Sequence, residues 1–398
     1  MTKSDSQEPV FHPEKTTIGM LGSGQLGRMF VHAAHELGYR VHVYSPDADS
    51  PAGSIADQQT VASYDDQAAL QKFAEQIDVA TLEFENLPVS SLQFLQQHVA
   101  VRPGPEVLET TQHRIREKSA LAAAGFPVAA FREVHSEEGL KACFAGPEAS
   151  HQYPAIVKTA TWGYDGKGQS RIESAEDIES AWAELDCESA IVEEFVDFQC
   201  ELSVVGVRSG SGQVACYDPI LNEHKNHILD VSVSPSGLPD KVNRDAMEIA
   251  ASILDTLGVV GVMCVEMFLT RDGRLIVNEL APRPHNSGHL TIEAHETSQF
   301  EQQVRSVCGL PLGSTGQNRP AAMVNLLGEL WSAGPPDFAA AEAIPDTHLH
   351  LYGKAEPRDG RKMGHITVLG ETDGVAAEAR RVRQLLSLQS RENGLPQT

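Results

Sequence analysis

The sequence of 398 residues is short of basic residues and lacks the segments that mark membrane and exported proteins. Its 31 lysines and arginines face 55 acidic residues, and the net charge of −24 argues against binding to phosphate backbones as a main role. No apolar run reaches the roughly 18 residues that span a membrane. Because the N-terminus has no apolar signal core, we expect a disordered extension at residues 1–15 and a cytoplasmic protein without membrane or nucleic-acid partners.

Cysteine pairs and a Walker A phosphate loop are also missing. The six cysteines form no C-x-x-C pair, which argues against a zinc site and a disulfide framework and leaves reduced thiols as the default. The length predicts roughly two to four domains. A content of 41% hydrophobic and 22% charged residues is typical of a soluble globular protein.

Regular structure begins with a β-α-β pattern. A strand over residues 16–22 runs into the glycine turn from Gly22 to Gly27, and a helix is expected from Arg28 to Leu37. Such a turn presents backbone N–H groups to an anion at the start of a helix. Asp47 lies where the ribose-binding acid of a dinucleotide site would lie. A phosphate on a substrate, or close packing of helix and strand without a ligand, would also explain the turn.

A later strand at residues 79–86 ends in acidic and amide side chains. In open α/β sheets, ligands sit beyond the carboxyl ends of the strands. Glu83 and Glu85 share one face of this strand because side chains alternate with a period of two. With Asn86 they are suited to accept hydrogen bonds from sugar hydroxyls or an amine, although exposed loop acids would look the same.

A second unit starts where the α/β pattern breaks near residues 103–105. A helix is expected over residues 109–124, and a buried strand then ends at Lys158. The following segment, residues 162–169, is rich in glycine. A mobile glycine loop can fold its N–H groups over phosphates. A flexible hairpin tip is the alternative.

A hairpin is expected around the Asp-Gly pair at residues 272–273, which favours a two-residue type I′ turn between two apolar runs. This register places Phe268 opposite Val277 and Glu266 opposite Glu279. Facing like charges repel by roughly 0.2–1 kcal/mol, so the two carboxylates call for a cation. Mg²⁺ would be favoured beside a polyphosphate. An exposed acidic pair on an edge hairpin is the alternative.

Polar side chains follow the second strand of this hairpin. Pro282 and Pro284 forbid ordinary ladder bonding, so a strand ends there and a rigid extended loop begins. The loop holds Arg283 and His285 directly after an apolar run, although charged side chains normally remain at the surface. This arrangement indicates a site at the end of a strand.

A basic turn at residues 358–362, between two expected strands, is a further signal. In a strongly acidic protein, a local cluster of cations is best explained as an anion site. Residues 371–398 are expected to form a helix and a polar tail.

Four motifs in this order resemble the N(5)-carboxyaminoimidazole ribonucleotide synthetases of the ATP-grasp superfamily: the glycine turn and residues 163–169, 278–289 and 360–365. The resemblance covers roughly residues 16–370. It implies an α/β fold, α+β overall, with three parts. They are a Rossmann-like domain at 16–112, a two-lobed ATP-grasp domain at 113–312 with its small lobe at about 125–197, and a small β-rich C-terminal domain and tail at 313–398.

The resemblance also implies the activity and partners. The protein would be an ATP-dependent carboxylating ligase of purine biosynthesis that uses ATP, bicarbonate, 5-aminoimidazole ribonucleotide and Mg²⁺, and it would form a homodimer. The nucleotide would contact Arg114, Lys158, Gly163, Tyr164, Asp165, Gly166, Lys167, Gly168, Gln169, Glu193, Glu194, Phe195, Val196, Glu201, His224, Asn278 and Glu279.

The remaining implied roles concern the metal and the two other substrates. Glu266 and Glu279 would bind Mg²⁺. The bicarbonate-derived group would be surrounded by Tyr164, Arg283 and His285, with His285 as a candidate to move a proton. The ribonucleotide would contact Gln25, Leu26, Glu83, Glu85, Asn286, Lys354, Arg361 and Lys362.

Three alternatives stay open at this point. A formate-using glycinamide ribonucleotide transformylase shares the glycine turn, the Asn-Glu pair and the basic strand, but the Tyr-Asp pair at 164–165 and the residues after His285 favour the carboxylating family. A Rossmann dehydrogenase would leave residues 150–290 unexplained. A catalytically silent, nucleotide-regulated binding module would not need Lys158 and the facing carboxylates.

Overall fold

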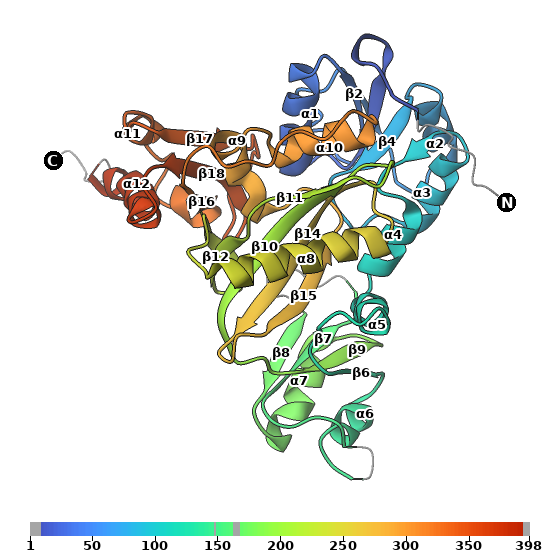
Figure 1. Cartoon of the computed structure of the whole chain (residues 1–398), viewed down its shortest axis with the longest axis vertical. Coiled ribbons are helices and arrows are strands. Elements are labelled where there is room, and N and C mark those ends of the chain that lie inside the picture. Colours follow the sequence, from blue (N-terminus) through green and yellow to red (C-terminus); the bar gives the residue numbers. More distant parts are fainter. Residues whose placement is uncertain (1–8, 147–148, 162–167, 393–398) are drawn as a thin grey trace.

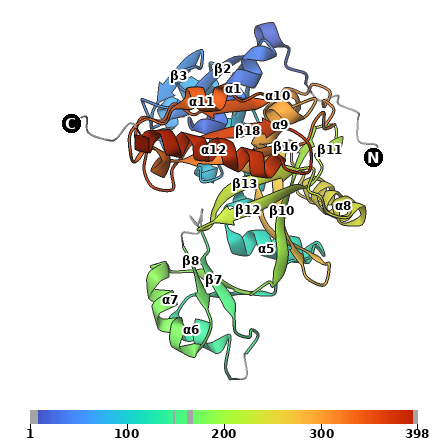
Figure 2. The ribbon, with the colours of Figure 1, turned by 90° about the vertical axis from the view of Figure 1, so that its left-hand side faces the viewer.

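The computed structural model describes residues 9–146, 149–161 and 168–392. Three sheets organise this part of the chain (Figure 1). Figures 1 and 2 place the N-terminal sheet and a small four-stranded sheet at opposite ends of the molecule, with a larger sheet between them. Among the described helices, none is both long and apolar enough to cross a membrane.

The N-terminal sheet is parallel, with the strand order β3-β2-β1-β4-β5. Strands β1 and β4 are buried almost throughout, as parallel strands covered on both faces must be. The predicted β-α-β opening is therefore present. The elements of this part are η1 (Pro13–Lys15), β1 (Thr17–Leu21), α1 (Gln25–Glu36), β2 (Arg40–Ser45), β3 (Gln58–Val61), α2 (Gln67–Ala74), β4 (Val79–Leu82), α3 (Val89–Gln96) and β5 (Ala100–Val101).

The chain leaves this sheet through two helices, α4 (Pro105–Thr111) and α5 (Arg114–Ala123), so the single helix predicted over residues 109–124 is wrong. His113 between them has an extended backbone, with φ −129° and ψ 109°. The Gln112 side chain donates to two backbone carbonyls beyond β4. The interruption between α4 and α5 therefore coincides with hydrogen bonds to the first domain, which helix propensity does not predict.

The small sheet is antiparallel, with the order β6-β9-β7-β8, and lies within residues 125–197, the range expected for a small lobe. Its core contains Val157, Ile172 and Val192 from the strands and Leu140 and Leu185 from the covering helices. Its elements are β6 (Phe131–Val134), α6 (Glu137–Ala142), β7 (Ala155–Thr159), β8 (Gln169–Ile172), η2 (Ala175–Asp177), α7 (Ile178–Leu185) and β9 (Ala190–Glu194).

The largest sheet has nine strands in the order β15-β14-β10-β12-β13-β16-β18-β17, with β11 paired to β10. Because β13 pairs with β16, the strands of residues 321–369 continue the sheet formed by the strands of residues 198–281. Its strands are β10 (Phe198–Arg208), β11 (Val214–Cys216), β12 (Ile220–Lys225), β13 (Ile228–Ser234), β14 (Gly261–Thr270), β15 (Leu275–Ala281), β16 (Ala321–Leu327), β17 (Thr347–Leu351) and β18 (Lys362–Leu369). The accompanying helices are α8 (Asp240–Thr256), η3 (Asn286–Leu290), α9 (Thr291–Ala294), α10 (Gln299–Val307), η4 (Gly328–Trp331), α11 (Phe338–Glu342) and α12 (Val375–Glu392).

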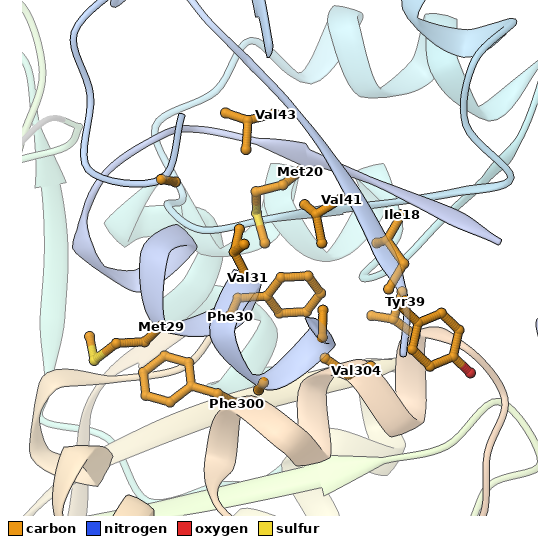
Figure 3. Packing of buried hydrophobic residues seen from close by; sticks show 14 of the residues in the cluster. Ile18, Met20, Met29, Phe30, Val31, Tyr39, Val41, Val43, Phe300 and Val304 are labelled. Atoms are coloured by element: carbon orange, nitrogen blue, oxygen red, sulfur yellow. The ribbon is translucent and has the colours of Figure 1, made fainter. Parts of the chain in front are cut away.

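Helix α10 joins the first domain to the large sheet. Its Phe300 and Val304 pack with Phe30 of α1 in one buried cluster (Figure 3). Phe11 packs against the same cluster, and its backbone N–H donates to the carbonyl of Cys308 at 2.9 Å. The predicted disordered extension at 1–15 is therefore wrong for the part around Phe11, because apolar contacts and a backbone bond hold it.

The hairpin of β14 and β15 places Glu266 opposite Glu279, as predicted, but the turn and the register that produce this pairing differ from the prediction. The turn has three residues between Thr270 and Arg274, and only Gly273 among them has positive φ. The predicted two-residue type I′ turn is therefore wrong, and Phe268 lies opposite Ile276. A β-bulge after Glu266 shifts the register by one residue and restores the acidic pair.

Candidate active site

A cavity of about 540 Å³ is lined by strands of the small and large sheets and by residues of the first domain that lie outside its strands. Its walls come from distant parts of the sequence, including Gln25 of the first domain and Lys362 near the C-terminus. Most of the predicted site residues line it: Gln25, Leu26, Glu85, Arg114, Lys158, Gln169, Glu193, Glu194, Phe195, Val196, Glu201, His224, Glu266, Asn278, Glu279, Arg283, His285, Asn286 and Lys362.

Other predicted residues lie away from this lining or outside the described chain. Lys354 lies close by, since its Nζ donates to the carbonyl of Lys362 at 2.8 Å. Arg361 bonds to the backbone of Glu356 at 2.7 Å. Those that do not line the cavity are Glu83, Gly168, Lys354 and Arg361. Those outside the described residues are Gly163, Tyr164, Asp165, Gly166 and Lys167.

The carboxylate of Glu83 closes the glycine turn at the start of α1. One of its oxygens accepts the Gly27 N–H at 2.6 Å and the other accepts the Gly24 N–H. A Cβ at position 24 would lie 2.8 Å from the carboxylate, so glycine is required there. The anion at this helix N-terminus is therefore the protein's own side chain. The contact of Glu83 with the ribonucleotide stays a prediction, and in this structure the side chain is 7% exposed and does not line the cavity.

Two lysines share one buried carboxylate at the small-lobe side of the cavity. Lys158 Nζ lies 2.7 Å from Glu193, and Lys118 Nζ lies 3.7 Å from it. Burial would raise the pKa of Glu193, but the charges of Lys158 and Lys118 outweigh burial and lower it to about 2. Lys118 also donates to the carbonyl of Val277 at 3.1 Å. The arrangement provides positive charge at the cavity wall without an exposed basic surface.

The sequence interpretation missed Lys118 and Glu117 as site residues, although both line the cavity. A helical spacing of four places Lys118 on the same face as Arg114, and that signal could have identified it. Glu117 is 3% exposed and accepts the Leu280 N–H at 3.2 Å. Burial raises the pKa of Glu117 to about 8, against the lowering effect of Lys118, and Glu279 adds to the rise.

The region after β9 forms the adjoining wall of the cavity. Phe198 and Phe268 stack there with centroids 4.6 Å apart. Glu201 pairs with Nδ1 of His224. Burial would lower the pKa of His224, but the bond and charge of Glu201 raise it. The stacked phenylalanine rings suit a heteroaromatic base, and the neighbouring pair of Glu201 and His224 suits its sugar hydroxyls.

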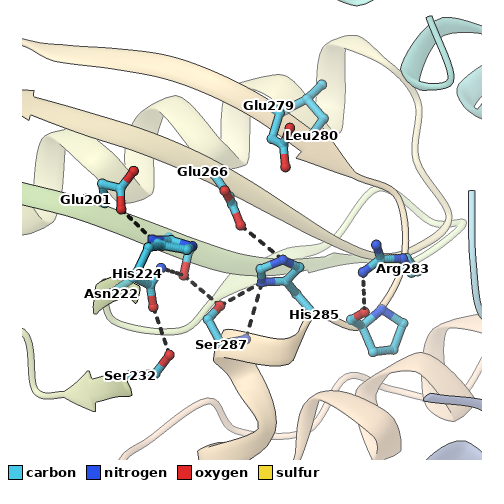
Figure 4. A network of polar contacts seen from close by, with 12 residues as sticks. Glu201, Asn222, His224, Ser232, Glu266, Glu279, Leu280, Arg283, His285 and Ser287 are labelled. Atoms are coloured by element: carbon cyan, nitrogen blue, oxygen red, sulfur yellow. Dashed lines mark hydrogen bonds and ion pairs between the residues drawn. The ribbon is translucent and has the colours of Figure 1, made fainter. Parts of the chain in front are cut away.

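Glu266 and Glu279 lie opposite each other at the centre of the site (Figure 4). His285 Nε2 lies 3.0 Å from Glu266, and Arg114 lies 3.1 Å from Glu279. Burial would raise the pKa of Glu266, but His285 outweighs it and lowers the pKa to about 2. Each carboxylate thus lies beside a basic side chain of the protein.

Whether this pair suits Mg²⁺ depends on what else would coordinate the ion. In the described part of the chain, no group of three or more His, Cys, Asp or Glu side chains could hold a metal. Protein-bound Mg²⁺ commonly uses one or two carboxylates, with phosphate oxygens and water completing its shell. Glu266 and Glu279 therefore fit the ion as the protein's share of a site that a nucleotide completes.

The loop after β15 turns its polar groups toward the first domain. Arg283 forms two bonds with Glu85, at 2.5 Å and 2.8 Å. Asn286 is 9% exposed, and neither atom of its amide has a hydrogen-bond partner within the described residues. A buried amide normally finds partners, so Asn286 marks a place for a ligand.

Comparison with known proteins shows the same order of domains. Family sequence models match a ribonucleotide synthetase preATP-grasp domain at residues 15–112, an ATP-grasp domain at 119–300 and a phosphoribosylaminoimidazole carboxylase C-terminal domain at 321–379. The N5-carboxyaminoimidazole ribonucleotide synthase of Bacillus subtilis (strain 168) is 43% identical over 356 residues, which cover 89% of this chain and 92% of that protein.

Two solved structures extend the similarity to the fold. An ADP complex of an N5-carboxyaminoimidazole ribonucleotide synthetase has 41% identity and a TM-score of 0.90, covering 96% of this chain and 99% of that one. The Aspergillus clavatus synthase in complex with ADP and 5-aminoimidazole ribonucleotide has 30% identity and a TM-score of 0.85, with coverage of 96% and 99%.

These matches confirm the predicted fold class and decide among the alternatives. The glycine turn binds its own Glu83, which removes the main argument for a dinucleotide-binding dehydrogenase. The relatives and structures described above carry the name of the carboxylating ligase. The chain belongs to the N5-carboxyaminoimidazole ribonucleotide synthase family of ATP-grasp ligases.

Proposed function

We propose that this chain uses ATP and bicarbonate to carboxylate 5-aminoimidazole ribonucleotide, yielding N5-carboxyaminoimidazole ribonucleotide, ADP and phosphate in de novo purine biosynthesis. The observation that carries the proposal is one cavity that joins a cation-lined pocket, two facing carboxylates and the loop of Arg283 and His285. The ADP and ribonucleotide complexes of the related enzymes support it.

The nucleotide belongs in the part of the cavity between the small and large sheets. Lys158 and Arg114 would contact its phosphates. The backbone at residues 193–196 would bond the adenine edge, while Glu201 holds the ribose beside His224. These assignments place the phosphates next to Glu279, because Arg114 already lies 3.1 Å from that carboxylate.

Glu266 and Glu279 would hold Mg²⁺ together with the nucleotide's phosphate oxygens. The ion would supply charge stabilisation to the phosphoryl group in transfer. The residues of this chain supply position: Arg114 and His285 hold the two carboxylates on facing strands. Phosphoryl transfer depends mainly on such positioning and charge.

Bicarbonate is a poor electrophile, so its oxygen must first attack the γ-phosphorus of ATP. The products of that step are ADP and carboxyphosphate, whose phosphate is a good leaving group. The amine of the ribonucleotide then forms a C–N bond with the carboxyl carbon, and phosphate and a proton leave. Arg283 would stabilise the anionic carboxyl group, and His285 would move the proton.

The ribonucleotide would lie between the first domain and the loop after β15. That part of the cavity is lined by Gln25, Glu85 and Asn286. The amide of Asn286 has no hydrogen-bond partner among the described residues and could bond to the ribonucleotide. Lys362 also lines this part of the cavity, and Lys354 lies beside Lys362. With Arg361, these lysines are our candidates for the ribonucleotide phosphate.

The test measures phosphate release by the purified protein. ATP hydrolysis should rise when 5-aminoimidazole ribonucleotide and bicarbonate are added together, and the product should carry label from bicarbonate. Stimulation by glycinamide ribonucleotide and formate would select the transformylase instead. An absence of stimulation by either pair would contradict the proposal.

The cytoplasmic location and the homodimer belong to the same proposal. Reduced thiols support the first, since no disulfide joins the six cysteines, all of which lie in the described part of the chain. The second rests on resemblance to the family alone. Light scattering during gel filtration should give a mass close to twice 43.1 kDa, and a monomer mass would contradict the dimer.

A further inference from the structure

The side-chain amide of Gln299, the first residue of α10, is bonded to the backbone of the loop after β15. Its Oε1 accepts the N–H of His285 at 2.8 Å, and its Nε2 donates to the carbonyl of the same residue at 2.7 Å. His285 has an extended backbone, with φ −120° and ψ 152°. In that conformation the N–H and C=O of one residue point to the same side, so the amide takes the place of a paired residue on a neighbouring strand.

The main chain of this loop has few groups that could fix it in another way. Pro282 and Pro284 have no N–H to donate. The N–H of Arg283 donates to the carbonyl of Ala281, the last residue of β15, at 2.8 Å. That bond is local and does not connect the loop to another element. The pair of bonds made by Gln299 therefore anchors the backbone of the loop to α10.

The amide of Gln299 is itself held firmly. The residue is 0% exposed, and a Cβ at Gly288 would lie only 2.6 Å from its Oε1. Its backbone N–H donates to Thr291 Oγ1 at 3.0 Å, and its Nε2 lies 3.3 Å from His289 Nδ1. Buried polar groups whose bonds are satisfied make their surroundings rigid. The position of α10 therefore determines the position of the loop.

Helix α10 is in turn fixed to the first domain. One turn along the helix from Gln299, the Nε2 of Gln303 donates to Thr81 Oγ1 on β4 at 2.8 Å. Phe300 and Val304 pack in the buried cluster that α10 shares with α1. The loop after β15 is thus held, through Gln299, by the same helix that binds the first domain.

We propose that Gln299 is a positioning residue for carboxylation, a role that rests on the proposed function of the loop. The side chain of His285 points from the loop toward Glu266 (Figure 4), and Asn286 lines the part of the cavity proposed for the ribonucleotide. A fixed backbone at His285 keeps both side chains at a set distance from the first domain. Carboxylation brings the amine against the carboxyl carbon, and a misplacement of about 1 Å can cost about 100-fold in rate. Gln299 itself does not line the cavity.

The critical variant is Gln299→Met, which keeps a side chain of similar length and removes both bonds to His285. The matched control is Gln302→Met on the same helix. Gln302 is also 0% exposed and makes the same pair of backbone bonds, to Gly313: its Nε2 donates to the carbonyl at 2.7 Å, and its Oε1 accepts the N–H at 3.0 Å. Neither of these two residues lines the cavity. Thermal unfolding shows whether each variant is folded.

Kinetics separate a positioning role from a loss of stability. Gln299→Met should lower kcat/KM for the ribonucleotide by about 10-fold. The KM for ATP should stay unchanged, because Arg114 and Lys158 lie on α5 and β7. Fewer carboxylated products should form for each phosphate released, since water then competes with the amine for carboxyphosphate. Gln302→Met should match the parent in all three measurements.

The position of the loop is measured without turnover. In ¹⁵N-histidine NMR, the backbone N–H signal of His285, assigned by its loss in His285→Gln, should shift in Gln299→Met. The same signal should not shift in Gln302→Met. If Gln299→Met does not fold, Gly288→Ala takes its place, because a Cβ at that position displaces the amide of Gln299.

Two results would overturn the proposal, and they apply equally to Gly288→Ala. One is an unshifted backbone signal of His285 in Gln299→Met, and the other is an equal loss of kcat/KM in both methionine variants. If the parent protein forms no product labelled from bicarbonate, the proposed function fails. The backbone signal still decides in that case whether Gln299 holds the loop.

Discussion

The guanidinium of Arg283 is held by two hydrogen bonds to the carboxylate of Glu85, across the boundary between the first domain and the large sheet. Both side chains are mostly buried, with exposed fractions of 16% and 25%. Burial would raise the pKa of Glu85, but the charge of Arg283 outweighs it and lowers the pKa. The residue proposed to stabilise the carboxyl group is thus oriented by the domain proposed to bind the ribonucleotide.

Glu85→Gln should weaken both binding and stability. The amide keeps the shape of the side chain but loses the charge, so Arg283 loses its strong partner. We expect kcat/KM for the ribonucleotide to fall by about 10-fold and the free energy of unfolding in urea to fall by about 1–3 kcal/mol. The control is Glu356→Gln, which removes an exposed ion pair with Arg358 and should leave both quantities unchanged.

Glu279→Gln should stop phosphoryl transfer. The variant removes one of two facing carboxylates and frees Arg114. We expect the single-turnover rate of ATP cleavage to fall by at least about 100-fold, with weaker binding of nucleotide in the presence of Mg²⁺ and little change in its absence. The exposed Glu296→Gln serves as the control. Equal magnesium dependence in variant and parent would contradict the metal assignment.

Lys118→Met should raise the KM for ATP and leave the KM for the ribonucleotide unchanged. It removes one of the two lysines that pair with Glu193 and leaves Lys158 as the ion-pair partner of that buried carboxylate. We expect the KM for ATP to rise by about 10-fold, because each lost charge-assisted bond costs roughly 1.5–3 kcal/mol. Steady-state kinetics with each substrate varied would show the difference. An increase in the KM for the ribonucleotide alone would show that Lys118 acts on the ribonucleotide and not on ATP.

Three imidazoles lie together where the C-terminal strands meet η3. The His350 and His365 centroids are 4.4 Å apart, and those of His289 and His365 are 4.8 Å apart. Tyr352 Oη and His365 Nδ1 are 2.9 Å apart. Burial lowers the pKa of His289 and of His365 well below the usual value of 6.5, and neighbouring histidines lower both further.

Acid should therefore destabilise the fold. Below pH 6.5 the unfolded chain binds protons at His289 and His365 that the folded protein excludes. Stability therefore falls as the pH decreases, by up to about 1.4 kcal/mol per pH unit for each of these two histidines. Urea unfolding from neutral pH down to about pH 5 should show this slope. His365→Gln should reduce the slope, and the exposed His98→Gln should not. A slope unaffected by His365→Gln would show that other groups control acid sensitivity.

Local sequence patterns predicted strands and helices better than they predicted the turns that connect them. The strands Thr17–Leu21 and Val79–Leu82 lie inside the ranges 16–22 and 79–86 that the sequence predicts. The hairpin shows the limit of such reasoning, because Glu266 faces Glu279 only through a bulge that compensates for a longer turn. Turn chemistry alone does not report a bulge, which depends on packing around both strands.

The sequence by itself was enough to predict the family, the order of the domains and most residues of the cavity. These properties depend on short motifs, whose residues lie close together in the chain and can be recognised without the fold. Tertiary structure decided how those residues are used. Only the fold shows that Glu83 binds the glycine turn while Glu85, two positions later, holds Arg283. Only the fold brings Lys118 to Glu193. Partners separated by tens to hundreds of residues depend on how whole elements pack, and no local pattern encodes that.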